Sequence, residues 1–112
     1  MTSRYEQNLE RYEALVATNS TIDRKGATMP YTSVNGHMFS LLTKDGYVAL
    51  RLPPDKRQAF LKRYKTTLSE QYGHVMPEYV VVPEALLKKT SELRKHFADS
   101  YAYVKSLKPK RK

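Results

Sequence analysis

Cysteine is absent from the 112-residue sequence, and so are long hydrophobic runs. Without cysteine the chain forms no disulfide and carries no thiol nucleophile, so a cytosolic protein is the simplest inference. No apolar segment approaches the roughly 20 residues that a membrane-spanning helix needs, and the first six residues lack the hydrophobic core of a secretory signal. We therefore expect a cytoplasmic protein with no membrane partner.

Motifs for metal binding are also missing. The histidines His37, His74 and His96 lie far apart in the sequence and lack the paired spacing of a zinc site. With no cysteine, a metal site would need carboxylates that the sequence does not cluster. We therefore expect no metal and no cofactor.

The usual catalytic motifs are missing as well. The sequence has no glycine-rich phosphate loop, no G-x-S-x-G nucleophile elbow and no H-E-x-x-H helix. Its carboxylates have structural tasks at a helix cap, a turn and two helix starts: Glu6, Asp45, Asp55 and Glu84. A catalytic pair of carboxylates brought together from distant positions is the remaining alternative. We expect no catalytic residues and no enzymatic activity.

The formal net charge is +9, and its location matters more than its size. Four cations lie in the last five residues, and without them the body carries about +5, a modest excess for a small domain. Basic residues in the segment 55–65 surround its predicted apolar face, as in an ordinary solvated helix. A mobile basic tail binds phosphates without fixed geometry, which makes five residues candidate nucleic-acid contacts: Lys105, Lys108, Lys110, Arg111 and Lys112. A disordered tail that only aids solubility is the open alternative.

Two hairpins follow one another between residues 29 and 54. Asn35-Gly36 and Asp45-Gly46 join apolar-rich runs, and these dipeptides supply the positive φ angles of tight hairpin turns. Three antiparallel strands are therefore predicted at residues 27–34, 37–43 and 47–52. Alternation in the third strand predicts one buried face and one more solvent-exposed face. The buried face is formed by Val48, Leu50 and Leu52, and the more exposed face by Tyr47, Ala49 and Arg51.

Helical periodicity occurs on both sides of the hairpins. Ser3 and Glu6 have capping-box spacing before an apolar stripe, which predicts a helix over residues 3–17. A second helix is predicted over residues 55–64, with Ala59, Phe60 and Tyr64 buried on the sheet. A long last helix is predicted to begin with Thr90 as its cap and to carry a core-facing stripe: Leu93, Phe97, Tyr101 and Val104.

The region between residues 65 and 90 is harder to interpret. β-branched residues predict a strand over residues 78–82 that Pro83 ends, followed by a helical turn over residues 84–88. Residues 66–72 are predicted as a strand paired with it across Gly73-His74, with a helix as the alternative. The order helix, three strands, helix, two strands and helix predicts a two-layer α+β domain over residues 1–107, with about five antiparallel strands. Residues 108–112 are predicted to form a basic disordered tail.

Nine tyrosines raise the question of a base-stacking surface. Four of them fall on the apolar faces of predicted helices, where a half-buried phenol is ordinary core: Tyr5, Tyr12, Tyr64 and Tyr101. Tyr31, Tyr47 and Tyr103 are free to form a surface site, but none lies in an RNA-recognition motif. We therefore expect the tyrosines to be mainly structural.

The hairpins and their flanks resemble the TfoX N-terminal domain family, small α+β domains first described from bacterial competence regulators. The resemblance covers about residues 5–107 and is carried by Met29-Pro30-Tyr31, Val34-Asn35-Gly36-His37-Met38-Phe39, Leu50-Arg51-Leu52, Met76-Pro77-Glu78-Tyr79-Val80-Val81-Val82-Pro83 and Tyr101-Ala102-Tyr103-Val104. It implies a five-stranded antiparallel sheet with helices packed on it, and it implies no catalytic residues. The regulators add a C-terminal helical domain, whereas this sequence ends at Lys112, so we expect a stand-alone domain.

These observations predict a non-enzymatic regulatory or protein-interaction module of a bacterial cytosol. An exposed sheet edge would allow contact with a protein partner or formation of a homodimer. The alternative is a nucleic-acid-associated protein that binds phosphates through its basic tail.

Overall fold

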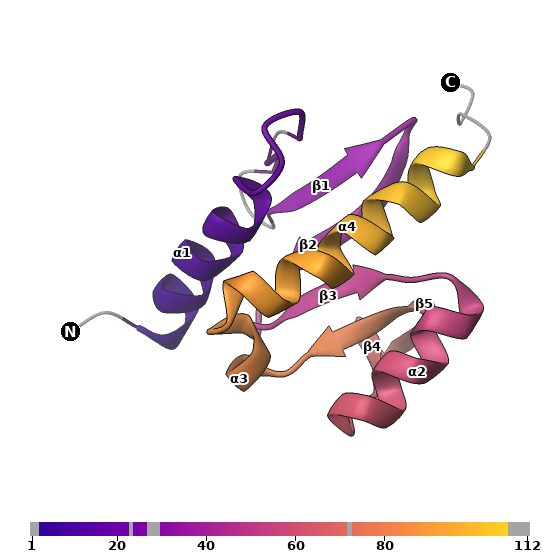
Figure 1. Cartoon of the computed structure of the whole chain (residues 1–112). Coiled ribbons are helices and arrows are strands. Elements are labelled where there is room, and N and C mark those ends of the chain that lie inside the picture. Colours follow the sequence, from indigo (N-terminus) through magenta and orange to yellow (C-terminus); the bar gives the residue numbers. More distant parts are fainter. Residues whose placement is uncertain (1–2, 23, 27–29, 72, 108–112) are drawn as a thin grey trace.

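The computed structural model describes residues 3–22, 24–26, 30–71 and 73–107 of the chain (Figure 1). Four helices and five strands follow one another in the order α1 (Arg4–Val16), β1 (Tyr31–Val34), β2 (His37–Leu42), β3 (Val48–Arg51), α2 (Pro54–Tyr64), β4 (Leu68–Gln71), β5 (His74–Val82), α3 (Glu84–Leu87) and α4 (Thr90–Ser106). The predicted tail at residues 108–112 and the predicted strand residues 27–29 lie outside the described part.

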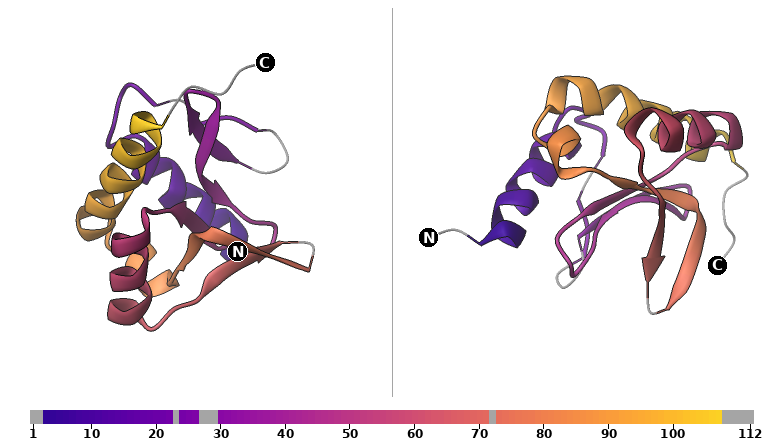
Figure 2. Two further views of the ribbon diagram at one scale, coloured as in Figure 1. Left: turned by 90° about the vertical axis from the view of Figure 1, so that its right-hand side faces the viewer. Right: turned by 90° about the horizontal axis from the view of Figure 1, so that it is seen from below.

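The strands form one antiparallel sheet in the order β1-β2-β3-β5-β4, with helices packed on it, so the predicted α+β architecture is confirmed (Figure 2). Directly paired residues of antiparallel strands share a face of the sheet. One such row crosses all five strands and faces the core: Thr32, Ser40, Leu50, Val80 and Leu68. The strand interpretation of residues 66–72 is thereby confirmed for β4.

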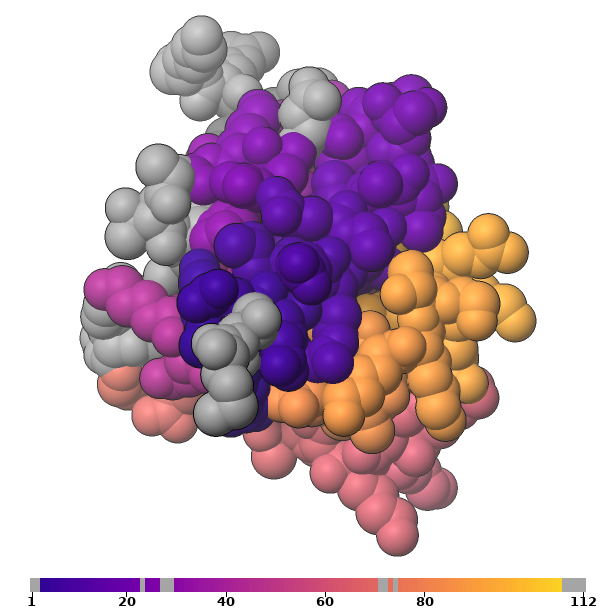
Figure 3. All heavy atoms as spheres, turned by 90° about the vertical axis from the view of Figure 1, so that its left-hand side faces the viewer, coloured from indigo at the N-terminus to yellow at the C-terminus, as the bar shows by residue number. Residues whose placement is uncertain are grey.

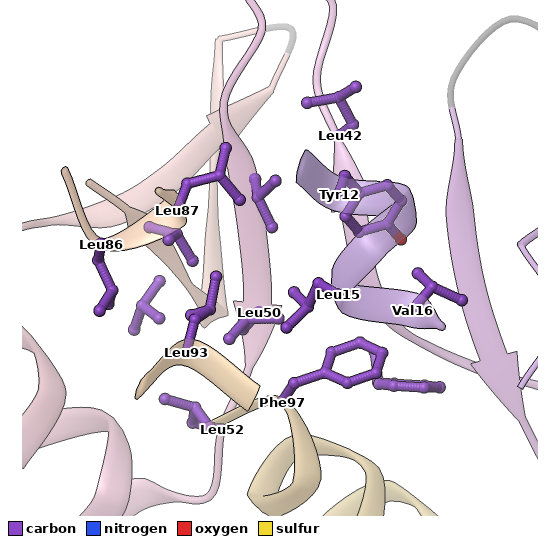
Figure 4. Packing of buried hydrophobic residues seen from close by; sticks show 14 of the residues in the cluster. Tyr12, Leu15, Val16, Leu42, Leu50, Leu52, Leu86, Leu87, Leu93 and Phe97 are labelled. Carbon is purple, nitrogen blue, oxygen red and sulfur yellow. The ribbon is translucent and has the colours of Figure 1, made fainter. Parts of the chain in front are cut away.

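Helices α2 and α4 lie over the same face of the sheet, and α3 leads into α4 (Figure 2). The main core forms where α4, α1 and the central strand β3 meet, as the close view shows (Figure 4). Phe97 of α4 packs against Phe39 of β2 in a tilted arrangement, with 5.5 Å between ring centroids. Ser100 of α4 is also fully buried, and its hydroxyl lies 2.6 Å from the Arg51 carbonyl oxygen. None of the helices in the described residues is long and apolar enough to cross a membrane.

Helix α1 begins as its sequence predicts. The Ser3 hydroxyl accepts a hydrogen bond from the Glu6 amide at 3.1 Å, which is the expected cap. The buried Asn8 then donates to the Gly46 carbonyl oxygen at 2.6 Å, which fixes α1 to the turn between β2 and β3. Figure 3 shows α1 packed beside α3 and the start of α4.

The two hairpin turns differ from each other. In the first, Asn35 and Gly36 have φ values of 54° and 81°, as a tight two-residue turn requires. In the second, the Gly46 amide donates to the Thr43 carbonyl oxygen at 2.9 Å, and Gly46 has a φ of 87°. Asp45 does not share this conformation, so the glycine alone supplies the positive φ predicted for this dipeptide. A longer loop closed by one left-handed glycine joins β2 to β3.

Three local predictions need correction. Ala59 is exposed rather than buried, so only Phe60 of α2 is fully packed in the core. The residue at the N-cap of α4 is Lys89, while Thr90 is the first helical residue and forms no capping hydrogen bond. Strand β5 begins at His74, four residues before the predicted start.

The sheet face opposite the helices is partly covered by its own tyrosines. Tyr79 of β5 donates to the Met38 carbonyl oxygen of β2 at 2.7 Å, although β3 lies between these two strands. The Tyr47 hydroxyl lies 3.3 Å from the Glu70 carbonyl oxygen of β4, beyond β5. The Tyr79 crossing contributes to the complete burial of Ala49, which the alternation pattern wrongly places on the more exposed face.

Candidate functional site

Positive charge gathers on the layer formed by α2, α3 and α4. Segments 54–65 and 84–106, which contain these helices, carry ten Lys and Arg residues against four Asp and Glu residues. Residues 1–53 and 66–83, which contain α1 and the sheet, carry six against seven. Because α2 and α4 cover the same side of the sheet (Figure 2), the outward surface of segments 54–65 and 84–106 forms one basic surface, here named the helical face.

Most cations of the helical face are free of ion pairs. Lys56 pairs with Asp99 at 3.2 Å, and Arg57 donates to the Pro77 carbonyl oxygen at 2.5 Å. Within the described residues, the remaining eight are exposed and form no ion pair: Lys62, Arg63, Lys65, Lys88, Lys89, Arg94, Lys95 and Lys105. Their uncompensated charge gives this surface a positive potential that attracts anions.

Two shallow depressions beside α2, here together named the groove, interrupt this surface. One depression of about 190 Å³ is lined by Tyr64, Pro83, Ala85, Leu86, Lys89 and Glu92. A second depression of about 120 Å³ is lined by Lys56, Ala59, Phe60, Arg63, His96 and Asp99. Pockets that bury a drug-sized ligand measure roughly 300–1,000 Å³, so each of these two depressions suits a small chemical group rather than a whole nucleotide.

Tyr64, Glu92 and His96 form a hydrogen-bonded chain in the groove. The Tyr64 hydroxyl oxygen lies 2.9 Å from Glu92 Oε2 and 2.9 Å from His96 Nε2. A phenol has one proton, and an ionised carboxylate only accepts, so the consistent arrangement has Tyr64 donating to Glu92 and His96 Nε2–H donating to Tyr64. This leaves Nδ1 as the nitrogen of His96 that gains and loses a proton.

The surroundings of His96 favour its neutral form. Burial is the main cause that lowers the pKa of His96 below its ordinary value. The cations Arg63 and Lys56 act in the same direction, whereas the carboxylates Asp99 and Glu92 oppose them. Its ring also packs edge-on against an aromatic neighbour, Phe60, with 5.0 Å between centroids. His96 is therefore mainly uncharged at neutral pH and becomes a cation on acidification.

A second charged cluster joins β3, β5 and α4. Arg51 donates to Glu78 Oε2 at 2.6 Å, and the Tyr103 hydroxyl donates to Glu78 Oε1 at 3.1 Å. Both carboxylate oxygens are therefore occupied, and the Arg51 guanidinium carbon lies 5.9 Å from the centre of the Tyr103 ring. These contacts connect the end of α4 to the sheet, which is a structural task.

The structure places only one of the predicted nucleic-acid contacts. Lys105 is exposed near the end of α4, with its ammonium 5.5 Å from the centre of the Tyr101 ring. The other four, at positions 108, 110, 111 and 112, lie outside the described residues. Of the predicted surface tyrosines, Tyr47 has its hydroxyl at hydrogen-bond distance from Glu70 of β4, and Tyr103 donates to Glu78 of β5. Tyr31 is half-buried.

Sequence reasoning missed the helical face itself. The cations of α2 do surround that helix, but α3 and α4 bring five further cations onto the same layer: Lys88, Lys89, Arg94, Lys95 and Lys105. Adding the charges of the helices separately from those of the sheet would have revealed the imbalance. Among the residues that the structure describes, no group of three or more acidic or histidine side chains is placed to hold a metal ion.

The sheet and its helices agree with the architecture that the resemblance to the TfoX N-terminal domain family implies. Membership of that family stays a prediction, because an architecture alone does not identify a family or a function. Comparisons of this chain with protein-family models, with curated proteins and with solved structures find no match.

Proposed function

We propose that this protein is a non-enzymatic, nucleic-acid-associated module of the cytoplasm, with a domain like the TfoX N-terminal domain. Its helical face binds the phosphate backbone, and the basic tail at residues 108–112 adds contacts to the same strand. The protein would regulate by binding to the nucleic acid rather than by catalysing a chemical reaction.

One observation carries this proposal, namely the unequal division of charge between segments 54–65 and 84–106, which form the helical face, and segments 1–53 and 66–83. The helical face holds an excess of six positive charges, whereas α1 and the sheet together hold an excess of one negative charge. Such a surface binds phosphate backbones through many weak contacts, each of which releases counterions from the nucleic acid. Contacts of this kind need no deep pocket, which agrees with the small volumes of the two depressions in the groove.

The proposal is tested with a matched pair of double variants. R94Q/K95Q removes two exposed charges from α4, and K25Q/K44Q removes two exposed charges outside the helical face. Binding to a fluorescent DNA duplex of about 20 base pairs is followed by anisotropy across a salt series. We expect R94Q/K95Q to reduce the slope of log K against log salt by about 2, because each backbone contact contributes about 0.9.

The control variant K25Q/K44Q should bind nearly as well as the unmodified protein, with the same salt slope. Thermal unfolding of each variant checks that the fold is intact. Absence of duplex binding at low salt, or equal losses in the two double variants, would contradict the proposal. The same series with single-stranded RNA shows which nucleic acid binds more tightly.

Association with a protein partner or a second copy is the second candidate function. It is favoured by the hairpin of β4 and β5, where β4 is an edge strand of the sheet and Val75 is 57% exposed. Edge strands offer unpaired backbone groups to other strands. Sedimentation over a range of concentrations should show a dimer that V75D weakens, while a monomer throughout, with no partner captured by crosslinking, would argue against this candidate.

A further inference from the structure

The two walls of the smaller depression differ in charge. On α2, Lys56 and Arg63 are seven residues apart, which is nearly two turns, so both side chains lie on the same side of the helix. On α4, His96 and Asp99 are three residues apart and face them. The exposed Ala59 leaves room between the walls, because its side chain is too short to fill the space.

The floor of this depression includes a buried aromatic ring. Phe60 is only 2% exposed, and its ring lies edge-on to His96. An anion here would meet the guanidinium of Arg63, whose planar fork matches two oxygens of a phosphate.

We propose that this depression receives one phosphate group of the bound nucleic acid, which Arg63 holds directly and which His96 also holds once it is protonated. This inference rests on the proposed function and adds a defined contact point to it. His96 Nε2 is engaged with Tyr64, so Nδ1–H is the donor left for the phosphate. Asp99 opposes the contact, because its carboxylate repels the phosphate and occupies the ammonium of Lys56.

A comparison of neighbouring cations tests the Arg63 contact. R63Q and K62Q each remove one exposed charge from α2, but only position 63 lines the depression. With the same labelled duplex at fixed salt, we expect R63Q to weaken binding about tenfold and K62Q about twofold, because a direct contact costs more than a distant charge. R63K should recover part of the loss, since a lysine keeps the charge without the fork.

Removal of the opposing carboxylate should have the reverse effect. D99N abolishes the repulsion and frees Lys56, so we expect the duplex to bind a few-fold more tightly at about pH 7.5. A surface where only the total charge matters would gain equally from the loss of any carboxylate, so the test is whether D99N gains more than a control at a distant position. E10Q, on the exposed side of α1, removes one negative charge far from the groove and is the matched control.

The pH dependence tests the role of His96. The charged and titratable groups that face it are Glu92 and Asp99 of α4 and Lys56, Arg63 and Tyr64 of α2. As the pH falls from about 7.5 to about 5.5, protonation of Nδ1 should strengthen binding. H96Q keeps an amide donor for Tyr64 but does not titrate there, so its affinity should change less over this range.

The outcomes separate the two proposals. If the unmodified protein does not bind the duplex, the proposed function fails and the phosphate site fails with it. If it binds, but R63Q equals K62Q, D99N equals E10Q and H96Q keeps the full pH response, then the helical face binds nucleic acid without this site. Support requires a larger loss in R63Q than in K62Q together with a larger gain in D99N than in E10Q.

Discussion

Three hydroxyl groups meet in the core between α1 and the sheet. The Tyr12 hydroxyl lies 2.7 Å from Ser40 Oγ, and Ser40 in turn forms a short hydrogen bond with Thr32. All three residues have no exposed surface. Burial raises the pKa of Tyr12 to about 12, so this phenol stays neutral across the physiological range.

The middle hydroxyl of this chain should matter most for stability. S40A leaves two buried hydroxyls without their shared partner, and each unsatisfied group costs about 1–3 kcal/mol. Y12F removes one end of the chain while Ser40 keeps Thr32, so it should cost about 1 kcal/mol. Urea unfolding should therefore show a loss of about 3 kcal/mol for S40A. Equal losses in the two variants would mean that the hydroxyls do not act as a chain.

At the scale of single elements, α2 ends in an unfavourable backbone conformation. Lys65 at its C-cap has φ 51° and ψ 48°, the left-handed region that glycine adopts without strain, and its amide donates to the Leu61 carbonyl oxygen. K65G should raise the free energy of unfolding by about 0.5–1 kcal/mol, because relief of strain exceeds the added entropy of the unfolded chain. K65A removes the same charge and retains the strain, so in urea unfolding it should not stabilise the protein.

The helices and strands were easier to predict from the sequence than the residues at which they begin and end. Helical periodicity and turn dipeptides identified α1, α2, α4 and the three-strand hairpins, because those signals are local. Strand β5 extends through Pro77 because its register with β4 is irregular there, between the pairs Leu68 with Val80 and Glu70 with Val75. A proline without an amide proton is tolerated in such a gap, which no local pattern reveals. The burial of Ala49 likewise involves Tyr79 of β5, whose side chain reaches across β3 to Met38 of β2.

At the scale of the whole molecule, the basic tail is visible in the sequence but the helical face is not. A run of like charge needs no fold to be recognised. The cations of α2 and α4 are more than twenty residues apart in the sequence, and only the packing of both helices on one side of the sheet adds their charges together. The groove depends equally on tertiary structure, since His96 and Tyr64 meet from separate helices.

The relative weight of the tail and the helical face can be measured. Neutralisation of the tail, K108Q/K110Q/R111Q/K112Q, keeps the chain length and removes four of the nine net charges. If tail and helical face both contact phosphates, the salt slope should fall by up to about 3.6 while measurable binding remains at low salt. Adding R94Q/K95Q to that variant should reduce the slope further, because those charges belong to the other surface. Complete loss of binding with the neutral tail would assign the interaction to the tail alone, and an unchanged slope would assign it to the helical face.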